Sequence, residues 1–451
     1  MSAMKYPEAV KYLYSFLNYE VKTDYSYPHD LNLRRMFFLM KLLGDPHQKL
    51  PFVLVAGTKG KGSTACFLAS ILCRGGFKAG LYTSPHLHEA RERIMTSGRK
   101  ISKKDFAALL ERIQKKISAN PLPSKLGCVT FFELLTTAAF LYFASRKMDI
   151  AVLEVGLGGR LDATNIVSPA VSVITPISYD HQDKLGSTLK KIALEKAHIV
   201  KKNSFFVSAG QPPKVRKIFK VWAKRKQAKS FFLGEDFTIR GREMTEHGSR
   251  FDFLSKEGAL PNLFVSLPGR FQLENAACAI QAARILDSHF GFKLDRSAYR
   301  LGLRRAFWPG RLQIVSKDPL VILDGAHNGA SFKALRESLP DLFPGRRMNL
   351  IFGISKDKDW HRILNELKLF DFNRLIVTQA KNPRAFPADE LFEKTKEQIP
   401  AAEYAPEIKT ALQSAFGGRH PKDFFVITGS FFLVAEAQTL FSVTKELAEA
   451  R

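Results

Sequence analysis

Residues 53–64 read Val-Leu-Val-Ala-Gly-Thr-Lys-Gly-Lys-Gly-Ser-Thr, and they give the strongest indication of the fold. An apolar run ends in a segment rich in glycine, lysine and hydroxyl residues, and the helix-compatible residues 65–72 follow. The order strand, glycine loop and helix is typical of phosphate binding, because glycine lets backbone N–H groups approach phosphate oxygens and the helix N-terminus adds partial positive charge. We predict that Lys61 reaches the outer phosphates of a bound nucleotide.

The spacing of this loop differs from that of a standard Walker A motif. Only Thr58 and Lys59 separate Gly57 from Gly60, whereas Walker A has four residues there, and Gly62 follows the lysine directly. The alternative is an ordinary glycine-rich turn with an exposed lysine. The strand before the loop and the helix after it favour nucleotide binding.

The composition predicts a globular, cytoplasmic protein of two or three domains. The chain has 451 residues, of which 45% are hydrophobic. It lacks both an apolar run long enough to span a membrane and the apolar core of a signal peptide at its N-terminus. Four cysteines without C-x-x-C spacing are typical of reduced thiols. We therefore expect neither a membrane partner nor export.

The charge balance is strongly basic. Lys and Arg number 69 against 43 Asp and Glu, which gives a formal net charge of +26 and attracts polyanions. The densest basic run, residues 214–229, places Val215, Ile218, Phe219 and Trp222 at helical spacing. We predict an amphipathic helix with a solvated basic face. A nucleic-acid surface is the alternative, and no known nucleic-acid-binding motif supports it.

Short apolar runs alternate with helical patterns along most of the chain. This alternation predicts an α/β fold with a mostly parallel sheet, with strands at 52–56, 79–83, 150–155, 170–175 and 205–207. Helices are expected at 104–118, 132–146, 188–200 and 272–290, and a small antiparallel excursion at 236–267. A hinge rich in Pro and Gly near residue 307 precedes further strands at 320–323, 349–353, 375–378 and 424–428. We predict two domains, residues 1–306 and 307–451.

Polar clusters follow three of the predicted strands. They are Thr-Ser-Pro-His at 83–86, the run from Glu154 to Asn165, and residues 175–181, which end in Asp180-His181. Each polar residue alone is more often structural. Because parallel strands end at one edge of a sheet, the three clusters together favour a magnesium–nucleotide site, where oxygen ligands are preferred.

These motifs, in this order, resemble the dihydrofolate synthase/folylpolyglutamate synthase family, a branch of the Mur ligase superfamily. The matching segments run from Asp30 to Ser430 and include Arg-Glu-Arg-Ile at 91–94, Glu-Lys-Ala at 195–197 and Pro-Gly-Arg at 309–311. The glycine loop belongs to Mur ligases generally, whereas 154–165 followed by Asp-Gly-Ala-His-Asn at 324–328 is more specific to the folate branch. The resemblance implies a P-loop ATPase domain and a smaller Rossmann-like α/β domain that carries the glutamate-ligase part.

The resemblance also implies the activity. Members of this family join a carboxylate to the amino group of L-glutamate at the expense of ATP, through an acyl phosphate. We expect a monomer that adds glutamate to dihydropteroate and to reduced folates with Mg²⁺, and the site allows a monovalent cation as well. One alternative is that only one of the two activities is present. An alternative of a different functional class is a nucleic-acid-stimulated P-loop ATPase, which the positive net charge would suit. We nevertheless expect no nucleic acid as a partner.

Individual residues take roles through the same resemblance. The expected ATP contacts are Gly57, Thr58, Lys59, Gly60, Lys61, Gly62, Ser63, Asn275, Arg311 and Asp324. The expected pteroate contacts are Asp30, Leu31, Asn32, Thr130, Leu161, Asp162 and Ala163. The expected metal ligands are Ser84, Glu154, His181 and Lys196, with Lys196 carboxylated on its side-chain nitrogen. Catalytic roles fall to Lys61, Lys196, His327 and Ser430.

Two positions depart from the family pattern. Lys59 replaces the asparagine that is commonest in the loop, and His198 stands where Glu-Lys-Ala is usually followed by glycine. We expect His198 to be an exposed helix residue, and a contact with Lys196 is the alternative.

Overall fold

The computed structural model describes residues 3–22, 25–27 and 30–449, and the chain forms two compact units. The first unit comprises Met1–Gly241, Phe251–Val265 and Gln272–Ala306. The second comprises Arg242–Arg250, Ser266–Phe271 and Phe307–Arg451. Each unit has its own sheet and its own hydrophobic core.

The first unit is built on an eight-stranded sheet of order β4-β3-β2-β5-β1-β6-β7-β8. The strands are β1 Phe52–Ala56, β2 Ala79–Tyr82, β3 Ile94–Thr96, β4 Arg99–Lys100, β5 Ile150–Glu154, β6 Val171–Ile174, β7 Phe205–Ser208 and β8 Lys229–Phe232. Neighbouring strands run parallel along β2-β5-β1-β6-β7-β8, and β3 and β4 form an antiparallel edge next to β2. Every residue of β1 is buried, as expected for a central strand covered on both faces.

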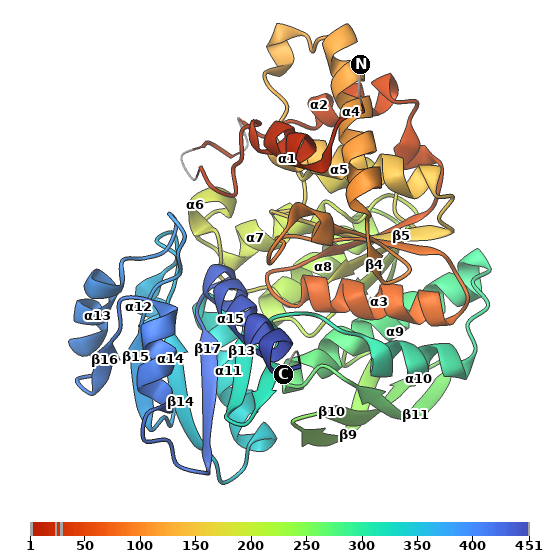
Figure 1. Cartoon of the computed structure of the whole chain (residues 1–451). Coiled ribbons are helices and arrows are strands. Elements are labelled where there is room, and N and C mark those ends of the chain that lie inside the picture. The colour runs from red at the N-terminus through yellow and green to blue at the C-terminus, as the bar shows by residue number, and fades with distance from the viewer. Residues whose placement is uncertain (1–2, 23–24, 28–29, 450–451) are drawn as a thin grey trace. The chain divides into compact units, whose positions relative to one another are not determined.

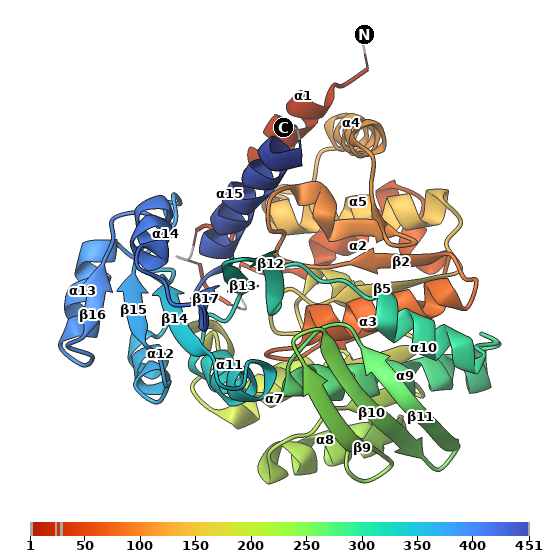
Figure 2. The same cartoon turned by 60° about the horizontal axis from the view of Figure 1, so that its bottom comes forward.

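Helices cover both faces of this sheet. α3 (Lys61–Arg74) packs on β1, β2 and β5, and α5 (Phe131–Ser145) lies across the sheet from it (Figures 1 and 2). The other helices are α1 Tyr6–Tyr14, α2 Leu33–Leu42, α4 Lys103–Ala119, α6 Gln182–Leu185, α7 Leu189–Ala197, α8 Pro213–Arg225, α9 Arg270–Phe290 and α10 Arg296–Arg305. The short 3₁₀ helices among the described residues are η1 Pro46–Gln48, η2 Ala90–Arg93, η3 Ser124–Leu126 and η4 Ala163–Ile166. This layering confirms the predicted α/β class.

A separate three-stranded sheet confirms the predicted antiparallel excursion. Its order is β11-β10-β9, with β9 at Phe237–Thr245, β10 at Gly248–Ser255 and β11 at Gly258–Val265. Only two residues join each strand to the next, and such short connections require antiparallel neighbours. α10 packs on β11 (Figure 2).

The second unit contains a six-stranded sheet of order β12-β13-β17-β14-β15-β16. Its strands are β12 Gln313–Lys317, β13 Leu320–Asp324, β14 Arg347–Phe352, β15 Arg374–Val377, β16 Ala402–Tyr404 and β17 Asp423–Thr428. β12 is antiparallel and the others are parallel. Its helices are α11 Gly329–Leu342, α12 Trp360–Leu367, α13 Ala388–Lys396, α14 Ile408–Phe416 and α15 Phe431–Glu449. Parallel strands alternating with helices confirm the predicted Rossmann-like architecture.

The basic run predicted as an amphipathic helix forms α8. Val215 and Phe219 are buried, whereas Lys217 and Lys224 are exposed. The helix ends at Arg225, earlier than the run of basic residues, because the chain then turns into β8. None of the helices in the described part of the chain is long and apolar enough to cross a lipid bilayer.

Candidate active site

The glycine loop leaves the end of β1 and is packed against two side chains. Gly57 has φ +148°, and a Cβ there would lie 1.8 Å from Thr175 Oγ1. Gly60 has φ +84° and precedes α3, and a Cβ there would lie 2.2 Å from Asn275 Oδ1. Glycine is therefore required at both positions, for backbone angle and for space. The packing also brings the predicted nucleotide contact Asn275 to the loop.

Thr58 connects the loop to the segment that follows β6. Its N–H donates to the carbonyl of Pro176 at 3.1 Å. Its side-chain oxygen lies 3.1 Å from both the carbonyl oxygen and the amide nitrogen of Ser178, donating to the first and accepting from the second. Lys61 Nζ lies 3.4 Å from the carbonyl oxygen of Thr58. The predicted phosphate-binding residues thus lie beside the chain that leads to His181.

Two of the predicted metal ligands lie together at the same sheet edge. Glu154 ends β5 and is buried, and its carboxylate accepts a hydrogen bond from the Ser84 N–H at 3.0 Å. Ser84 follows β2, the neighbour of β5. A hydroxyl and a carboxylate are oxygen donors of the kind that Mg²⁺ prefers. The residues present therefore fit this ion.

His181 lies on the connection to α6. Its backbone has φ +47°, and its N–H donates to the Asp180 carboxylate at 3.0 Å. Within the described ranges, no three His, Cys, Asp or Glu side chains form a group that could hold a metal. Of the four predicted metal ligands, only Glu154 and His181 are residues of these types. The other two are Ser84 and Lys196.

Lys196 is a buried cation near the end of α7. Burial, and after it the charge of Lys61, lower the pKa of Lys196 to about 7. The glycine run 156–159 lies directly against this helix end, since a Cβ on Gly159 would lie 2.7 Å from the Glu195 carbonyl oxygen and 3.0 Å from Lys196 Cα. The charge of Lys61, in the phosphate loop, therefore acts on the buried Lys196 amine.

Asp162, one of the predicted pteroate contacts, shapes its own loop. Its carboxylate accepts from the Thr164 N–H at 3.0 Å, the Thr164 hydroxyl at 2.6 Å and the Leu157 N–H at 2.9 Å. Burial raises the pKa of Asp162. Leu161 and Ala163 flank this fixed carboxylate, so the loop that presents them is rigidly held.

A buried ion pair joins two further segments of the predicted pteroate site. Arg35 donates to the Asp30 carbonyl at 2.8 Å and to the Glu133 carboxylate at 2.8 Å. Glu133 in turn accepts from the Thr130 N–H at 2.9 Å. Asn32 caps α2 by accepting from the Arg34 N–H, and Leu31 precedes it. The capping box Thr130-x-x-Glu133 is readable in the sequence, but nothing there shows that Arg35 is its partner.

In the second unit, Asp324 is buried at the end of β13. It accepts hydrogen bonds from the N–H groups of Leu312 at 3.0 Å and Ala326 at 2.9 Å. Burial raises the pKa of Asp324, and the charge of Arg311 opposes this shift. Asp324 is thus fixed next to Arg311, another predicted nucleotide contact.

Phe431 brings the other predicted residues of this unit together. The Arg311 guanidinium lies 4.7 Å from the Phe431 ring centroid, and the His327 ring centroid lies 5.6 Å from it. Ser430 follows β17, the parallel neighbour of β13, and its hydroxyl oxygen accepts from the Leu433 N–H at 3.1 Å. Arg311, Asp324, His327 and Ser430 therefore gather where these two strands end.

The expectation for His198 is wrong. Its ring is half-buried against Trp222, with the ring centroids 4.6 Å apart, and Nδ1 lies 2.7 Å from the Leu194 carbonyl oxygen. Burial lowers the pKa of His198. The basic helix α8 packs on α7 and covers this position, which a reading of α7 alone does not reveal.

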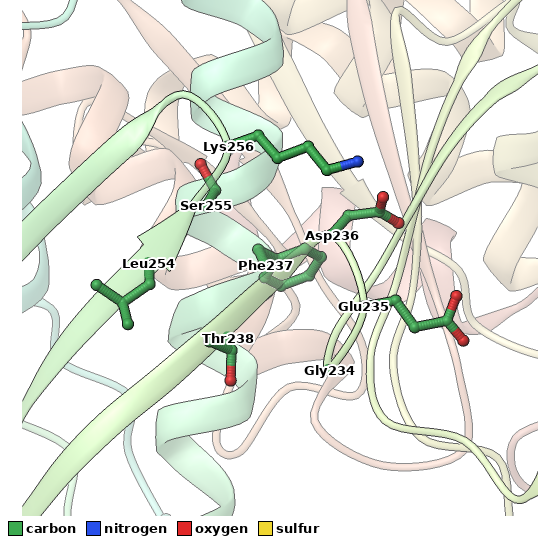
Figure 3. Close-up of a pocket in the computed structure, with 8 residues that line it drawn as sticks. All are labelled: Gly234, Glu235, Asp236, Phe237, Thr238, Leu254, Ser255 and Lys256. Carbon is green, nitrogen blue, oxygen red and sulfur yellow. The ribbon is translucent and has the colours of Figure 1, made fainter.

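A cavity of about 390 Å³ lies away from all of these residues. It is lined by Gly234, Glu235, Asp236, Phe237, Thr238, Leu254, Ser255 and Lys256 (Figure 3). These residues lie around the start of β9 and the β10–β11 turn, and none of them belongs to the predicted site. The cavity therefore has no part in the candidate active site.

Comparison with known proteins places both units in one family. Residues 55–283 match the Mur ligase middle domain and residues 310–431 match the Mur ligase glutamate ligase domain. The dihydrofolate synthase/folylpolyglutamate synthase of Bacillus subtilis is 33% identical over 96% of this chain and 98% of its own. The folylpolyglutamate synthase of Lacticaseibacillus casei is 32% identical over 97% and 99% of the two chains.

Solved structures show the same likeness. The folylpolyglutamate synthase of Mycobacterium tuberculosis complexed with ADP has a TM-score of 0.87 and 31% identity, covering 96% of this chain and 99% of that one. A complex of FPGS with AMPPCP and folate has a TM-score of 0.84 and 30% identity, covering 97% of this chain and 100% of that one.

Proposed function

Because the chain belongs to the dihydrofolate synthase/folylpolyglutamate synthase family of Mur ligases, we propose that it adds L-glutamate to dihydropteroate and to reduced folates at the expense of ATP. The observation that carries this proposal is the convergence of three features at one sheet edge. These are the glycine loop, the contact between Ser84 and Glu154, and the buried Lys196, whose pKa is lowered by burial and by the charge of Lys61.

The chemistry explains why such a site is needed. A carboxylate is a poor acyl donor, because the oxygen that would leave carries full negative charge. Transfer of the γ-phosphoryl group of ATP to the carboxylate gives an acyl phosphate and ADP. The glutamate amine then attacks the acyl carbon, phosphate leaves, and the amine loses a proton. Most of the catalytic work is therefore the positioning of anions and the neutralisation of their charge, to which Lys61 contributes.

Mg²⁺ would be held by Ser84 and Glu154, with His181 as a further ligand, and it supplies positive charge for the phosphate groups when bound. We propose that the Lys196 amine reacts with CO₂ in its neutral form, losing a proton and becoming a carbamate anion. The lowered pKa of Lys196 supports this, because the neutral amine is abundant near pH 7. A monovalent cation is compatible with the anion so formed.

The remaining predicted residues divide between nucleotide and acceptor. Asn275, Arg311 and Asp324 are proposed to contact the nucleotide, and His327 and Ser430 to serve glutamate addition. We assign these tasks to domains at residues 1–306 and 307–451. A positive net charge of +26 draws anionic folates and ATP toward the protein. We propose a monomer that works in the cytoplasm without nucleic acid.

The test is a substrate-pair assay with the purified full chain. Dihydropteroate or tetrahydrofolate is incubated with ATP, Mg²⁺ and labelled L-glutamate, and each component is omitted in turn. We expect one glutamyl product from each folate substrate. Product from only one of the two folate substrates would show that the protein has a single activity. Product from neither, together with ATP hydrolysis that DNA or RNA stimulates, would favour a nucleic-acid-dependent ATPase.

A further inference from the structure

The Glu195 carboxylate joins two segments that are far apart in the sequence. Tyr27 Oη donates a hydrogen bond to one of its oxygens at 2.7 Å, and Arg160 Nε donates to the other at 2.9 Å. The Glu195 side chain is only 17% exposed and immediately precedes Lys196 in α7. The function proposed above gives no role to Tyr27.

Backbone packing brings the same segments together. A Cβ on Gly158 would lie 2.9 Å from Tyr27 Oη, and a Cβ on Gly159 would lie 2.7 Å from the Glu195 carbonyl oxygen. The glycine run is therefore in direct contact with both Tyr27 and α7, and a side chain at either glycine would push one of them away.

The segment that carries Tyr27 has a second attachment. Lys184 of α6 donates to the Tyr25 carbonyl at 2.7 Å, and its ammonium group lies 4.2 Å from the Tyr25 ring centroid. Three residues after Tyr27, Asp30 begins one predicted pteroate segment, and directly after Arg160, Leu161 begins the other. Glu195 thus connects the two pteroate segments at a point next to Lys196.

We propose that Tyr27 is a positioning residue that determines the affinity for the pteroate substrate. Through its hydrogen bond to Glu195, Tyr27 fixes the position of segment 30–32 relative to segment 161–163 and to Lys196. This inference rests on the function proposed above. A neutral donor to a carboxylate makes a charge-assisted hydrogen bond, which is stronger than one between neutral groups. Burial raises the pKa of Tyr27, so its hydroxyl keeps the proton that it donates.

The test compares Tyr27→Phe with Tyr25→Phe. Both variants lose one hydroxyl from the same segment, but the contacts of Tyr25 with Lys184 use its carbonyl and its ring, which phenylalanine keeps. For Tyr27→Phe we expect the KM for dihydropteroate to rise about tenfold, as for loss of one hydrogen bond to a charged group. The kcat and the KM for ATP should stay at their wild-type values, and Tyr25→Phe should match the wild type throughout.

A double-mutant cycle with Glu195→Ala, which leaves no side-chain acceptor for the Tyr27 hydroxyl, shows whether Tyr27 acts through Glu195. Glu195→Ala itself is expected to impair turnover, because Glu195 lies next to Lys196. Adding Tyr27→Phe to it should then raise the KM for dihydropteroate less than about twofold, since coupled residues are not additive. An additive, tenfold increase would overturn the role of Glu195.

Each remaining result decides between the two claims. If the wild type forms product and Tyr27→Phe behaves like Tyr25→Phe, the inference is wrong while the proposed function stands. If Tyr27→Phe impairs both KM values and kcat together and lowers the Tm, Tyr27 only supports the fold and the inference is wrong. If the wild type forms no product, the proposed function itself fails.

Discussion

Lys61 and Lys196 are two cations whose charges act on each other within the candidate active site. Burial and the charge of Lys61 both disfavour the charged form of Lys196. A carbamate at Lys196 would replace this repulsion with an attraction and place an anion beside the phosphate loop. Burial and the charge of Lys61 therefore favour the neutral amine that the proposed carbamate formation requires.

Replacing Lys196 tests this account. Lys196→Ala should lose most of the activity, and added short carboxylates such as acetate should restore part of it by supplying the missing anion. Turnover is measured with and without the carboxylate, and wild-type enzyme with the same salt is the control. Unaltered activity of Lys196→Ala, or equal stimulation of the wild type, would exclude the proposed role.

Substitutions of Lys61 and Glu154 provide a second test. Lys61→Ala and Glu154→Ala should each lower kcat by about a hundredfold or more, because Lys61→Ala removes positive charge from phosphoryl transfer and Glu154→Ala removes a proposed ligand of Mg²⁺. Their Tm and circular dichroism should match the wild type. Lys49→Ala, an exposed lysine of the same unit, is the matched control. Near-normal turnover of Lys61→Ala or Glu154→Ala would discredit the assigned site.

Among the elements, the loop between β1 and α3 was the most predictable. Its glycines, its lysine and the apolar strand before it are local signals, and strand β1 has the bounds expected from the sequence. The short edge strands β4 and β16 carry too few apolar residues to be predicted. The contacts of Arg35 with Glu133 and of Tyr27 with Glu195 span 98 and 168 residues, so only the folded chain reveals them.

The packing of the loop gives a prediction with an internal control. Gly60 and Gly44 have φ of +84° and +81°, but only at Gly60 would a Cβ meet a neighbour, Asn275. Gly60→Ala should therefore raise the KM for ATP about tenfold, whereas Gly44→Ala should cost only about 1 kcal/mol of stability. Steady-state kinetics and urea unfolding separate the two effects. Equal KM values for ATP in both variants would contradict the loop geometry.

η1 carries a pH-dependent contribution to stability. His47 packs on Phe140 with only 6% of its side chain exposed, and burial lowers the pKa of His47 from 6.5. Below about pH 6.5 the unfolded chain binds the proton more readily, so this contribution is present above that pH and is lost as the pH falls. Between about pH 7 and pH 5, the wild type should lose more free energy of unfolding than His47→Gln.

Urea unfolding at several pH values measures this difference, which is at most about 1.4 kcal/mol per pH unit. If His47→Gln shows the wild-type dependence on pH, the buried imidazole makes no contribution of this kind.

For the whole molecule, the fold class and the central strands of the two mostly parallel sheets followed from alternating strand and helix patterns, whereas the site depends on contacts between segments. The first unit gathers the glycine loop, Ser84, Glu154 and Lys196 at one sheet edge, and the second gathers Arg311, Asp324, His327 and Ser430 at another. These clusters and the family membership support an ATP-dependent ligase that activates a carboxylate.

The most direct test follows an oxygen atom through the reaction. Dihydropteroate labelled with ¹⁸O in its carboxylate is incubated with the protein, ATP, Mg²⁺ and L-glutamate, and the products are analysed by mass spectrometry. An acyl phosphate intermediate predicts a product one glutamyl unit heavier and one ¹⁸O atom in the phosphate released with it. Glutamyl product with unlabelled phosphate would contradict activation through an acyl phosphate, and absence of that product would contradict the ligase activity on dihydropteroate.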